Sequence, residues 1–319
     1  MEQRRLGDRR VGAIGLGAMS FGGIFGPTDR ATSLACLDAA ADAGITHVDT
    51  ADIYGNGLSE QVIGAWGRRD IHVATKCGIV TGPPRTVRND EAYIRQSLEA
   101  SLRRLNRDHV DLYYVHRRQP DIPVEDLAGT MGRLVQEGKI GGYGLSEVAP
   151  ATLRRAHAEH PVTAVQNEFS LWTRLPQLGL IQACGELGVA FVAFSPLGRG
   201  MFGRDPLARD FRAGIDFRDT NPRFVEPNFS ANIAAIRPFR DLCAARGWTV
   251  PGAALAWVLA QGDHIIPIPG TRTADHLRDW QGVTLDKDDI VLIERILPAG
   301  FAQGDRYGDH QMAFVERYC

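Results

Sequence analysis

The sequence predicts an α/β protein folded as a single (β/α)8 TIM barrel that spans residues 1–319. Short apolar segments typical of strands alternate with amphipathic segments typical of helices, and eight strands are expected. No linker rich in proline, serine or charge divides the chain. The length would allow two domains of about 150 residues, but an α/β barrel routinely uses about 250 residues or more as one domain. The alternating pattern therefore decides for one barrel.

The expected strands are short runs of apolar and β-branched residues. Such nearly continuous apolar runs are typical of parallel strands that are buried on both faces. In chain order they cover residues 13–16, 45–48, 71–75, 112–115, 140–145, 162–165, 189–194 and 265–268. Before them, residues 4–11 with Gly7-Asp8 at the centre predict a β-hairpin that closes the bottom of the barrel.

Helices are expected between the strands, where apolar residues recur every three or four positions. Asp90 is a good N-cap for a helix whose apolar face carries Ile94, Leu98, Leu102 and Leu105. A second such face carries Leu127, Met131, Leu134 and Val135. Glycines at the ends of helical segments mark the turns into the next strand; they are Gly44, Gly138, Gly188 and Gly262.

Composition and charge exclude several classes of function. With 36 Lys+Arg against 38 Asp+Glu the chain lacks a basic surface for nucleic acid, and no apolar run of about 18 residues predicts a membrane span. The N-terminal Met-Glu-Gln-Arg-Arg lacks the apolar core of a secretion signal, and the five cysteines are odd in number and widely spaced. We therefore expect a reduced, cytoplasmic protein, of unknown oligomeric state, whose partner is a small molecule.

Four ionisable residues follow successive strands at the end of the barrel where active sites lie. Asp49 and Tyr54 follow the second strand, Lys76 ends the third and His116 ends the fourth. Any one of them alone is more often a helix cap or a satisfied polar group. Together they predict proton delivery to a carbonyl: Asp49 pairs with the buried Lys76, this cation lowers the pKa of Tyr54, and His116 orients the carbonyl oxygen.

These residues and several further motifs resemble the aldo-keto reductase superfamily nearly from end to end. The matching motifs are Asp-Thr-Ala-x-x-Tyr at 49–54, Ala-Thr-Lys at 74–76, His-Arg at 116–117, Gly-Leu-Ser at 144–146, Gln166, Phe-Ser-Pro-Leu-Gly-Arg-Gly at 194–200 and Ile-Pro-Gly-Thr-Arg at 268–272. The resemblance implies that Tyr54 is the general acid, Lys76 tunes it, Asp49 supports Lys76, and His116 positions the carbonyl. It also implies NADPH as the hydride donor.

The resemblance also implies which residues contact the cofactor. Ser146 and Gln166 would bond the carboxamide, Phe194 would stack beneath the nicotinamide ring, and Asp49 and Met19 would lie beside it. The pyrophosphate loop would comprise Ser195, Leu197, Gly198, Arg199 and Gly200, with Arg199 adding charge. The 2′-phosphate of adenosine would be bound by Gly270, Thr271 and Arg272. A guanidinium at this place would favour NADPH over NADH.

The chain departs from the common family pattern at a few positions. Glu147 stands where many members have asparagine, in a Gly-Leu-Ser-Glu form similar to a bacterial and plant branch that includes pyridoxal reductases and auxin-induced-like proteins. At the adenosine end the usual Glu-Asn is Asp279-Trp280, and His276 replaces a longer basic or amide side chain. Both His276 and Asp279 are expected at the cofactor.

The leading hypothesis is an NADPH-dependent carbonyl reductase, and two alternatives stay open. Lys76 could instead form a Schiff base, as in barrel aldolases. The chain could also be a redox-sensing partner protein similar to potassium-channel β subunits. No metal site is expected, because the nine histidines include no His-x-x-x-His pair joined to a cysteine or carboxylate at the spacing of metal ligands.

Several local features also have two readings. Cys77 is either a reactive thiol or inert filler, and Trp172 is either a wall of the substrate site or loop packing. The pair Arg117-Arg118 is either a solvated rim or a gate for acidic substrates. Residues 198–228 and 298–319 have the length and composition of lids.

Overall fold

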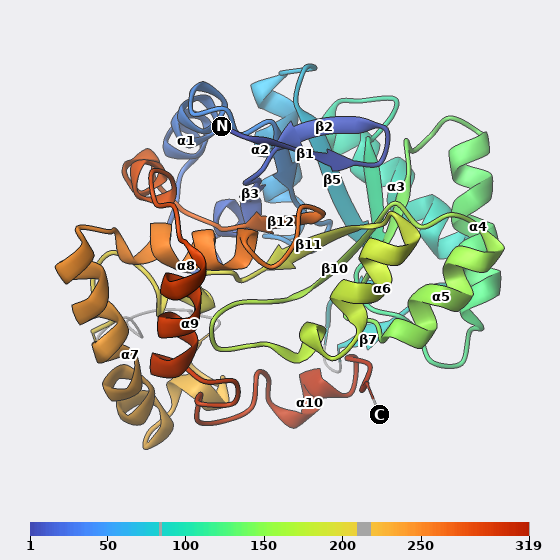
Figure 1. Ribbon diagram of the computed structural model, residues 1–319. Helices are drawn as coiled ribbons and strands as arrows, with labels where there is room; N and C mark the ends of the chain where they lie inside the picture. Colours follow the sequence, from blue (N-terminus) through green and yellow to red (C-terminus); the bar gives the residue numbers. More distant parts are fainter. Residues whose placement is uncertain (83–84, 209–217, 319) are drawn as a thin grey trace.

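Eight parallel strands form the central sheet in the computed structural model of the chain, which describes residues 1–82, 85–208 and 218–318 (Figure 1). Each strand pairs with the next in chain order. Their bounds are β3 (Leu16–Gly17), β4 (His47–Asp49), β5 (His72–Cys77), β8 (Leu112–Val115), β9 (Tyr143–Ser146), β10 (Ala164–Glu168), β11 (Ala190–Phe194) and β12 (Ile265–Ile268). The eight predicted strands are confirmed, although the first lies later than the expected 13–16.

The first and last strands meet and close the ring. The N–H groups of Gly15 and Gly17 donate to the carbonyl oxygens of Pro267 and Pro269, each over 2.9 Å, and Gly17 forms a parallel bridge with Gly270. A Cβ at Gly17 would lie 2.8 Å from the carbonyl oxygen of Ile268. This close approach explains the glycine and confirms the predicted barrel.

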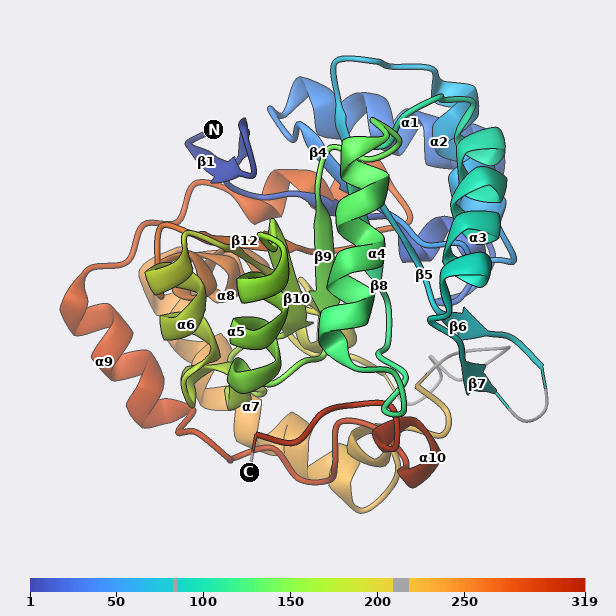
Figure 2. The same ribbon diagram turned by 90° about the vertical axis from the view of Figure 1, so that its right-hand side faces the viewer.

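Helices surround the barrel and alternate with its strands (Figures 1 and 2). Their bounds are α1 (Arg30–Asp42), α2 (Leu58–Trp66), α3 (Glu91–Leu105), α4 (Val124–Gln136), α5 (Pro150–Glu159), α6 (Leu180–Leu187), α7 (Asn228–Arg246), α8 (Val250–Leu259), α9 (Lys287–Ile296) and α10 (Asp309–Met312). As predicted, Asp90 caps α3, its side chain accepting from the N–H of Tyr93, and the predicted apolar face of α3 is buried.

The N-terminal hairpin closes one end of the barrel. Strands β1 (Gln3–Leu6) and β2 (Arg9–Gly12) pair antiparallel, and Leu6 and Val11 pack with the side chains inside the barrel. Arg4 donates to the carbonyl oxygens of Gly262 and Ile265, which secures the hairpin to the turn before β12 and to the first residue of that strand. Figure 2 shows the hairpin and α10 at opposite ends of the barrel.

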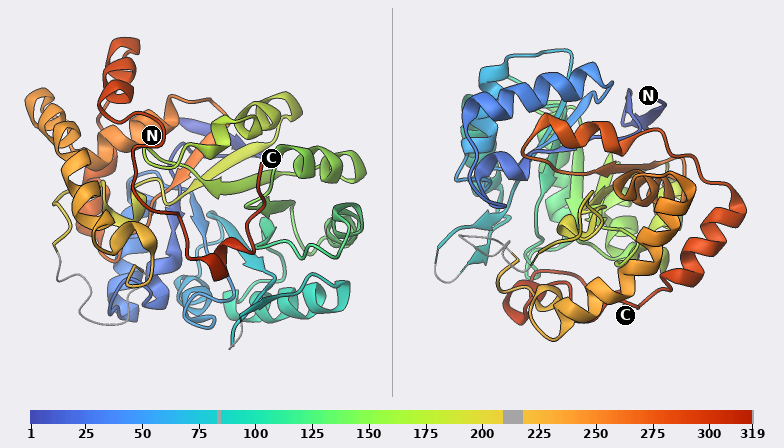
Figure 3. Two further views of the ribbon diagram at one scale, coloured as in Figure 1. Left: turned by 90° about the horizontal axis from the view of Figure 1, so that it is seen from below. Right: turned by 90° about the vertical axis from the view of Figure 1, so that its left-hand side faces the viewer.

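The C-terminal mouth carries the longer connections. Strands β6 (Ile79–Val80) and β7 (Thr86–Val87) form a small hairpin there, and the chain after α9 runs across the mouth through α10 (Figures 2 and 3). Part of the predicted lid at 198–228 lies outside the described residues. Within those described, no single helix is long and apolar enough to cross a membrane, and only the pair α7 and α8, bent by 98°, passes that test together.

Candidate active site

A buried ion pair lies at the centre of the mouth. Lys76, from β5, is fully buried, and its Nζ contacts Asp49 Oδ1 and donates to the carbonyl oxygen of Thr50 over 2.7 Å. The other carboxylate oxygen of Asp49 accepts from Gln166 Nε2 at 2.8 Å. Burial alone would lower the pKa of Lys76, but Asp49 and Tyr54 hold it above its ordinary value. Lys76 is therefore a fixed cation.

Tyr54 lies beside this cation, and its ring centroid is 5.2 Å from Lys76 Nζ. The prediction that Lys76 lowers the pKa of Tyr54 below its ordinary value is wrong for the protein without ligands. Burial raises the pKa of Tyr54, and Lys76 opposes that rise without reversing it. The physical reason is that the phenol is almost completely buried and Asp49 also disfavours the phenolate. At neutral pH Tyr54 is thus in its proton-carrying form.

His116 follows β8 and lies edge-on to the Tyr54 ring, with 5.9 Å between the ring centroids. Its Nδ1 is buried and has no hydrogen-bond partner in the part of the chain that the structure describes. Burial, with the nearby charges of Arg117 and Lys76, holds its pKa well below the ordinary value. A neutral imidazole has one N–H to donate, which suits contact with a carbonyl oxygen.

These groups border a cavity of about 690 Å³, within the range of small-molecule sites. Most residues predicted for the site line it: Met19, Asp49, Tyr54, His116, Ser146, Gln166, Phe194, Ser195, Leu197, Arg199, Gly200, Gly270, Thr271, Arg272, His276 and Asp279. Two do not. Lys76 is enclosed beside Asp49, and Gly198 faces the rings of Trp172 and Phe202, each 3.1 Å from where its Cβ would be.

The opposite end of the cavity is formed by residues after β12. Thr271 Oγ1 and His276 Nδ1 are 2.8 Å apart, and the exposed Arg272 reaches the carbonyl oxygen of Pro27 at 3.5 Å. The carboxylate of Asp279 accepts from Arg204 Nε at 2.6 Å. Arg204, which sequence reasoning did not single out, thus connects the segment after β11 to the segment after β12.

Arg199, which is predicted to add charge at the pyrophosphate, already contacts acceptors within the chain. Its Nη2 donates to Glu168 Oε2 at 2.9 Å and its Nη1 to the carbonyl oxygen of Arg306 at 2.7 Å, both buried. Arg199 is therefore paired with Glu168, a carboxylate that it shares with Arg306, and it also lines the cavity.

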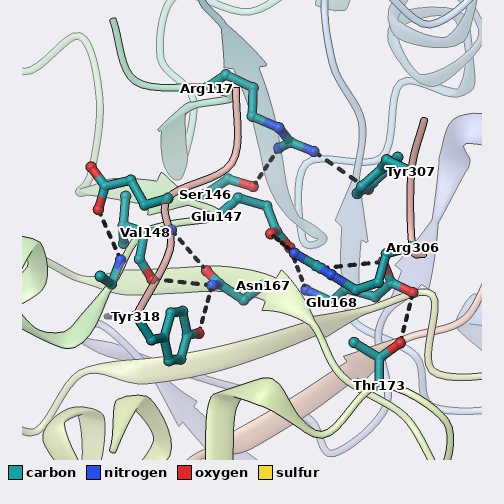
Figure 4. A network of polar contacts seen from close by, with 12 residues as sticks. Arg117, Ser146, Glu147, Val148, Asn167, Glu168, Thr173, Arg306, Tyr307 and Tyr318 are labelled. Carbon is teal, nitrogen blue, oxygen red and sulfur yellow. Dashed lines mark hydrogen bonds and ion pairs between the residues drawn. The ribbon is translucent and has the colours of Figure 1, made fainter. Parts of the chain in front are cut away.

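A network of charges holds the C-terminal tail against the mouth (Figure 4). Arg306 donates to Glu147 Oε2 at 2.6 Å and to Glu168 Oε2 at 3.3 Å. Although burial would raise it, Arg306 holds the pKa of Glu147 below its ordinary value. The next residue, Tyr307, lines the cavity. Sequence reasoning missed Tyr307, because the tail has no periodicity from which its direction could be read.

The open alternatives at single residues are decided by packing. Cys77 is fully buried, and burial raises the pKa of its thiol. These features are typical of an inert packing residue rather than a reactive thiol. Trp172 packs against Phe202 and Phe224 and is not among the residues that line the cavity. The described ranges contain no cluster of potential metal ligands.

The chain belongs to the aldo/keto reductase family, whose model matches residues 13–298. It is 40% identical over 308 residues to aldo-keto reductase yakc of Schizosaccharomyces pombe, named for NADP(+), covering 93% of this chain and 90% of that one. It is 37% identical over 319 residues to a probable aldo-keto reductase of Glycine max, covering 97% and 92%. A solved glycerol dehydrogenase from Gluconobacter oxydans has a TM-score of 0.81 at 28% identity, covering 92% and 94%.

Proposed function

We propose that the chain is an NADPH-dependent carbonyl reductase that reversibly converts an aldehyde or ketone to the alcohol. The observation that carries this proposal is the buried Asp49–Lys76 pair next to Tyr54, with the unpartnered His116 nitrogen at the same cavity. Membership of the family supports it, and so does the NADP(+) in the name of the yeast relative.

The donors around the cavity suit a dinucleotide. Ser146 and Gln166 offer a hydroxyl and an amide for the carboxamide, and Phe194 offers a flat apolar face. Arg272 at the other end suits a 2′-phosphate, because a guanidinium binds a phosphate far better than a bare ribose hydroxyl. When bound, NADPH supplies the hydride.

The proton comes from the chain itself. Tyr54 carries its proton at neutral pH and donates it to the carbonyl oxygen, while neutral His116 donates a hydrogen bond to the same oxygen and fixes its position. The phenolate left on Tyr54 is stabilised by the ammonium of Lys76. Asp49 keeps this ammonium charged and in place.

The Schiff-base alternative fits these contacts poorly. A Schiff base needs a neutral amine with access to the substrate. Lys76 Nζ is instead enclosed, bonded to Asp49 and to the Thr50 carbonyl, and does not line the cavity. The partner-protein alternative keeps the same site, so turnover is what separates it from the reductase.

The test is a fluorescence titration of the purified protein with NADPH and with NADH, followed by NADPH oxidation with 4-nitrobenzaldehyde and pyridoxal. Tighter binding of NADPH together with turnover is the expected result. Binding without turnover of any aldehyde would favour the partner protein. Failure to bind either nucleotide would overturn the assignment of the cavity.

A further inference from the structure

Arg117 is a buried cation at the catalytic end of the cavity. It is 9% exposed and lines the cavity next to His116. Its Nη1 donates to the His116 carbonyl oxygen at 2.6 Å and to Ser146 Oγ at 3.1 Å, and its Nη2 lies 3.5 Å from the Tyr307 hydroxyl (Figure 4). All three of these acceptors are neutral.

No carboxylate oxygen of the described chain lies within 4.0 Å of the Arg117 guanidinium. Its neighbour Arg118 differs, since it pairs with Glu316 and faces the tail. The buried Arg199 and Arg306 likewise pair with Glu168 or Glu147. Burying a guanidinium without a counter-ion costs the free energy of its hydration, and an anion bound beside it offsets that cost best.

The surroundings add positive charge and no free negative charge. Among the described residues, the carboxylates that line the cavity are Asp49, paired with Lys76, and Asp279, paired with Arg204. The charge of Arg117 also acts on the Glu147 carboxylate, but Glu147 is itself paired with Arg306. Arg85 also lines the cavity, and its charge, like that of Arg117, acts on His116. No acidic residue among those described forms an ion pair with Arg85 either. The catalytic end therefore has an excess of positive charge.

The phosphates of a dinucleotide do not account for this charge. Arg272 lies at the other end, after β12, whereas Arg117 contacts Ser146, which is proposed to bind the neutral carboxamide. The anion that Arg117 suits must therefore belong to the substrate. A planar guanidinium matches a carboxylate in both charge and donor geometry.

We propose that the substrate is a carbonyl compound that carries a carboxylate, with Arg117 binding the carboxylate and Arg85 attracting it from the rim of the cavity. This inference rests on the proposed reductase function and narrows it to acidic aldehydes or ketones. It also decides between the two readings of the Arg117-Arg118 pair: Arg117 selects acidic substrates, and Arg118 holds the tail.

The test compares 4-carboxybenzaldehyde with its neutral methyl ester, two substrates that share the same reacting group. The wild-type protein is expected to have a higher kcat/KM for the acid by about tenfold or more, as for other buried charge pairs. Arg117→Gln should remove this preference, mainly by raising KM for the acid. Arg155→Gln, which removes one exposed arginine from α5, is the matched control and should keep it.

A role of Arg117 in merely orienting Ser146 predicts a different result. The variant would then lose activity with both aldehydes to the same extent, and NADPH binding would weaken in the fluorescence titration. Equal losses, or a wild-type protein without preference for the acid, would overturn the inference and leave the reductase assignment intact. A wild-type protein that turns over none of the aldehydes would instead overturn the reductase assignment itself.

Binding of benzoate and benzamide to the NADP(+)-saturated protein, measured by calorimetry, gives a readout without turnover. Benzoate should bind at least about tenfold more tightly, and this difference should shrink in Arg85→Gln, whose partly exposed side chain makes misfolding a small risk. Equal binding of the two ligands to the wild-type protein would contradict the proposal even if Arg117→Gln failed to fold.

Discussion

At the scale of single residues, Tyr54 is where burial and charge act in opposite directions. Burial keeps the proton on the phenol, and Lys76 stabilises the anion formed once the proton has left. Both effects suit the proposed role of Tyr54 as an acid that holds its proton until a carbonyl oxygen accepts it. Burial of Tyr54 therefore stabilises the neutral phenol, and the separate charge of Lys76 stabilises the phenolate.

The first prediction concerns this hydroxyl. Tyr54→Phe should lower kcat by about a hundredfold to ten-thousandfold, the usual contribution of a general acid. NADPH binding, followed by fluorescence, should change little, because the hydroxyl is not needed for cofactor affinity. A comparable loss of binding and turnover would refute the assigned role.

Arg272 is the second residue for which the proposed function makes a specific prediction. Arg272→Ala should raise the Kd for NADPH by about tenfold and leave the Kd for NADH nearly unchanged, since only NADPH carries the 2′-phosphate. Parallel fluorescence titrations measure both constants. If both cofactors weakened equally, a residue other than Arg272 would be the one that recognises the phosphate.

At the scale of elements, the tail after α9 is bound to the barrel through the residue that follows β9 and the last two residues of β10. Glu147 and Glu168 accept hydrogen bonds from Arg306. The N–H of Glu316 donates to the Glu147 carbonyl oxygen, and Asn167 donates to the Tyr318 hydroxyl. Figure 3 shows this segment crossing the barrel mouth. The tail is therefore part of the wall of the cavity.

A third prediction tests this anchoring. Glu147→Gln keeps the size of the side chain but leaves Arg306 short of a counter-charge, and should cost about 3 kcal/mol of unfolding free energy in urea. It should also raise KM, because Tyr307 loses its fixed position. The control is Glu186→Gln, in the exposed pair with Arg154, which should cost less than about 1 kcal/mol. Equal costs would mean that the network does not anchor the tail.

At the scale of the whole molecule, a buried pair of histidines makes the stability of the barrel depend on pH. His47 and His72 lie buried side by side on β4 and β5, with 2.9 Å between their Nδ1 atoms. Burial lowers the pKa of His47 and lowers that of His72 well below the ordinary value. Because one Nδ1 must accept from the other, at least one ring is neutral in the folded protein.

The fourth prediction follows from the sign of these shifts. An unfolded histidine has a pKa of about 6.5, whereas the folded pair binds a proton only at lower pH. The pair therefore contributes fully to the free energy of unfolding above about pH 6.5, and this contribution is lost as the pH falls below that value. Burial raises the pKa of Asp52 to about 7, which acts in the opposite direction. The pH dependence of stability in a variant that lacks one of these histidines must therefore be compared directly with that of the wild type.

Urea unfolding between about pH 5 and pH 8 makes this comparison. His72→Gln should reduce the loss of stability on acidification by up to about 1.4 kcal/mol per pH unit, the limit for one site. His109→Gln, at an exposed position, is the control. An acid slope in His72→Gln that matches the wild-type slope would contradict the prediction.

The order of strands and helices and the position of polar residues after each strand are properties of the local sequence. Periodicity and caps such as Asp90 fix the elements, and a parallel barrel brings every strand end to the same mouth. The sequence by itself therefore predicted the barrel and which residues meet at the cavity, including Tyr54 and His116.

Only the tertiary structure decided how charges are partnered, because pairing depends on contacts between residues far apart in the chain. It paired Arg199 with Glu168, brought Tyr307 into the cavity through Arg306, and separated Arg117 from its neighbour Arg118. The direction of the Tyr54 pKa was likewise decided by burial, a property of the whole fold. The residue types set which chemistry is possible, and the packing of distant segments set the charge state in which each residue meets a substrate.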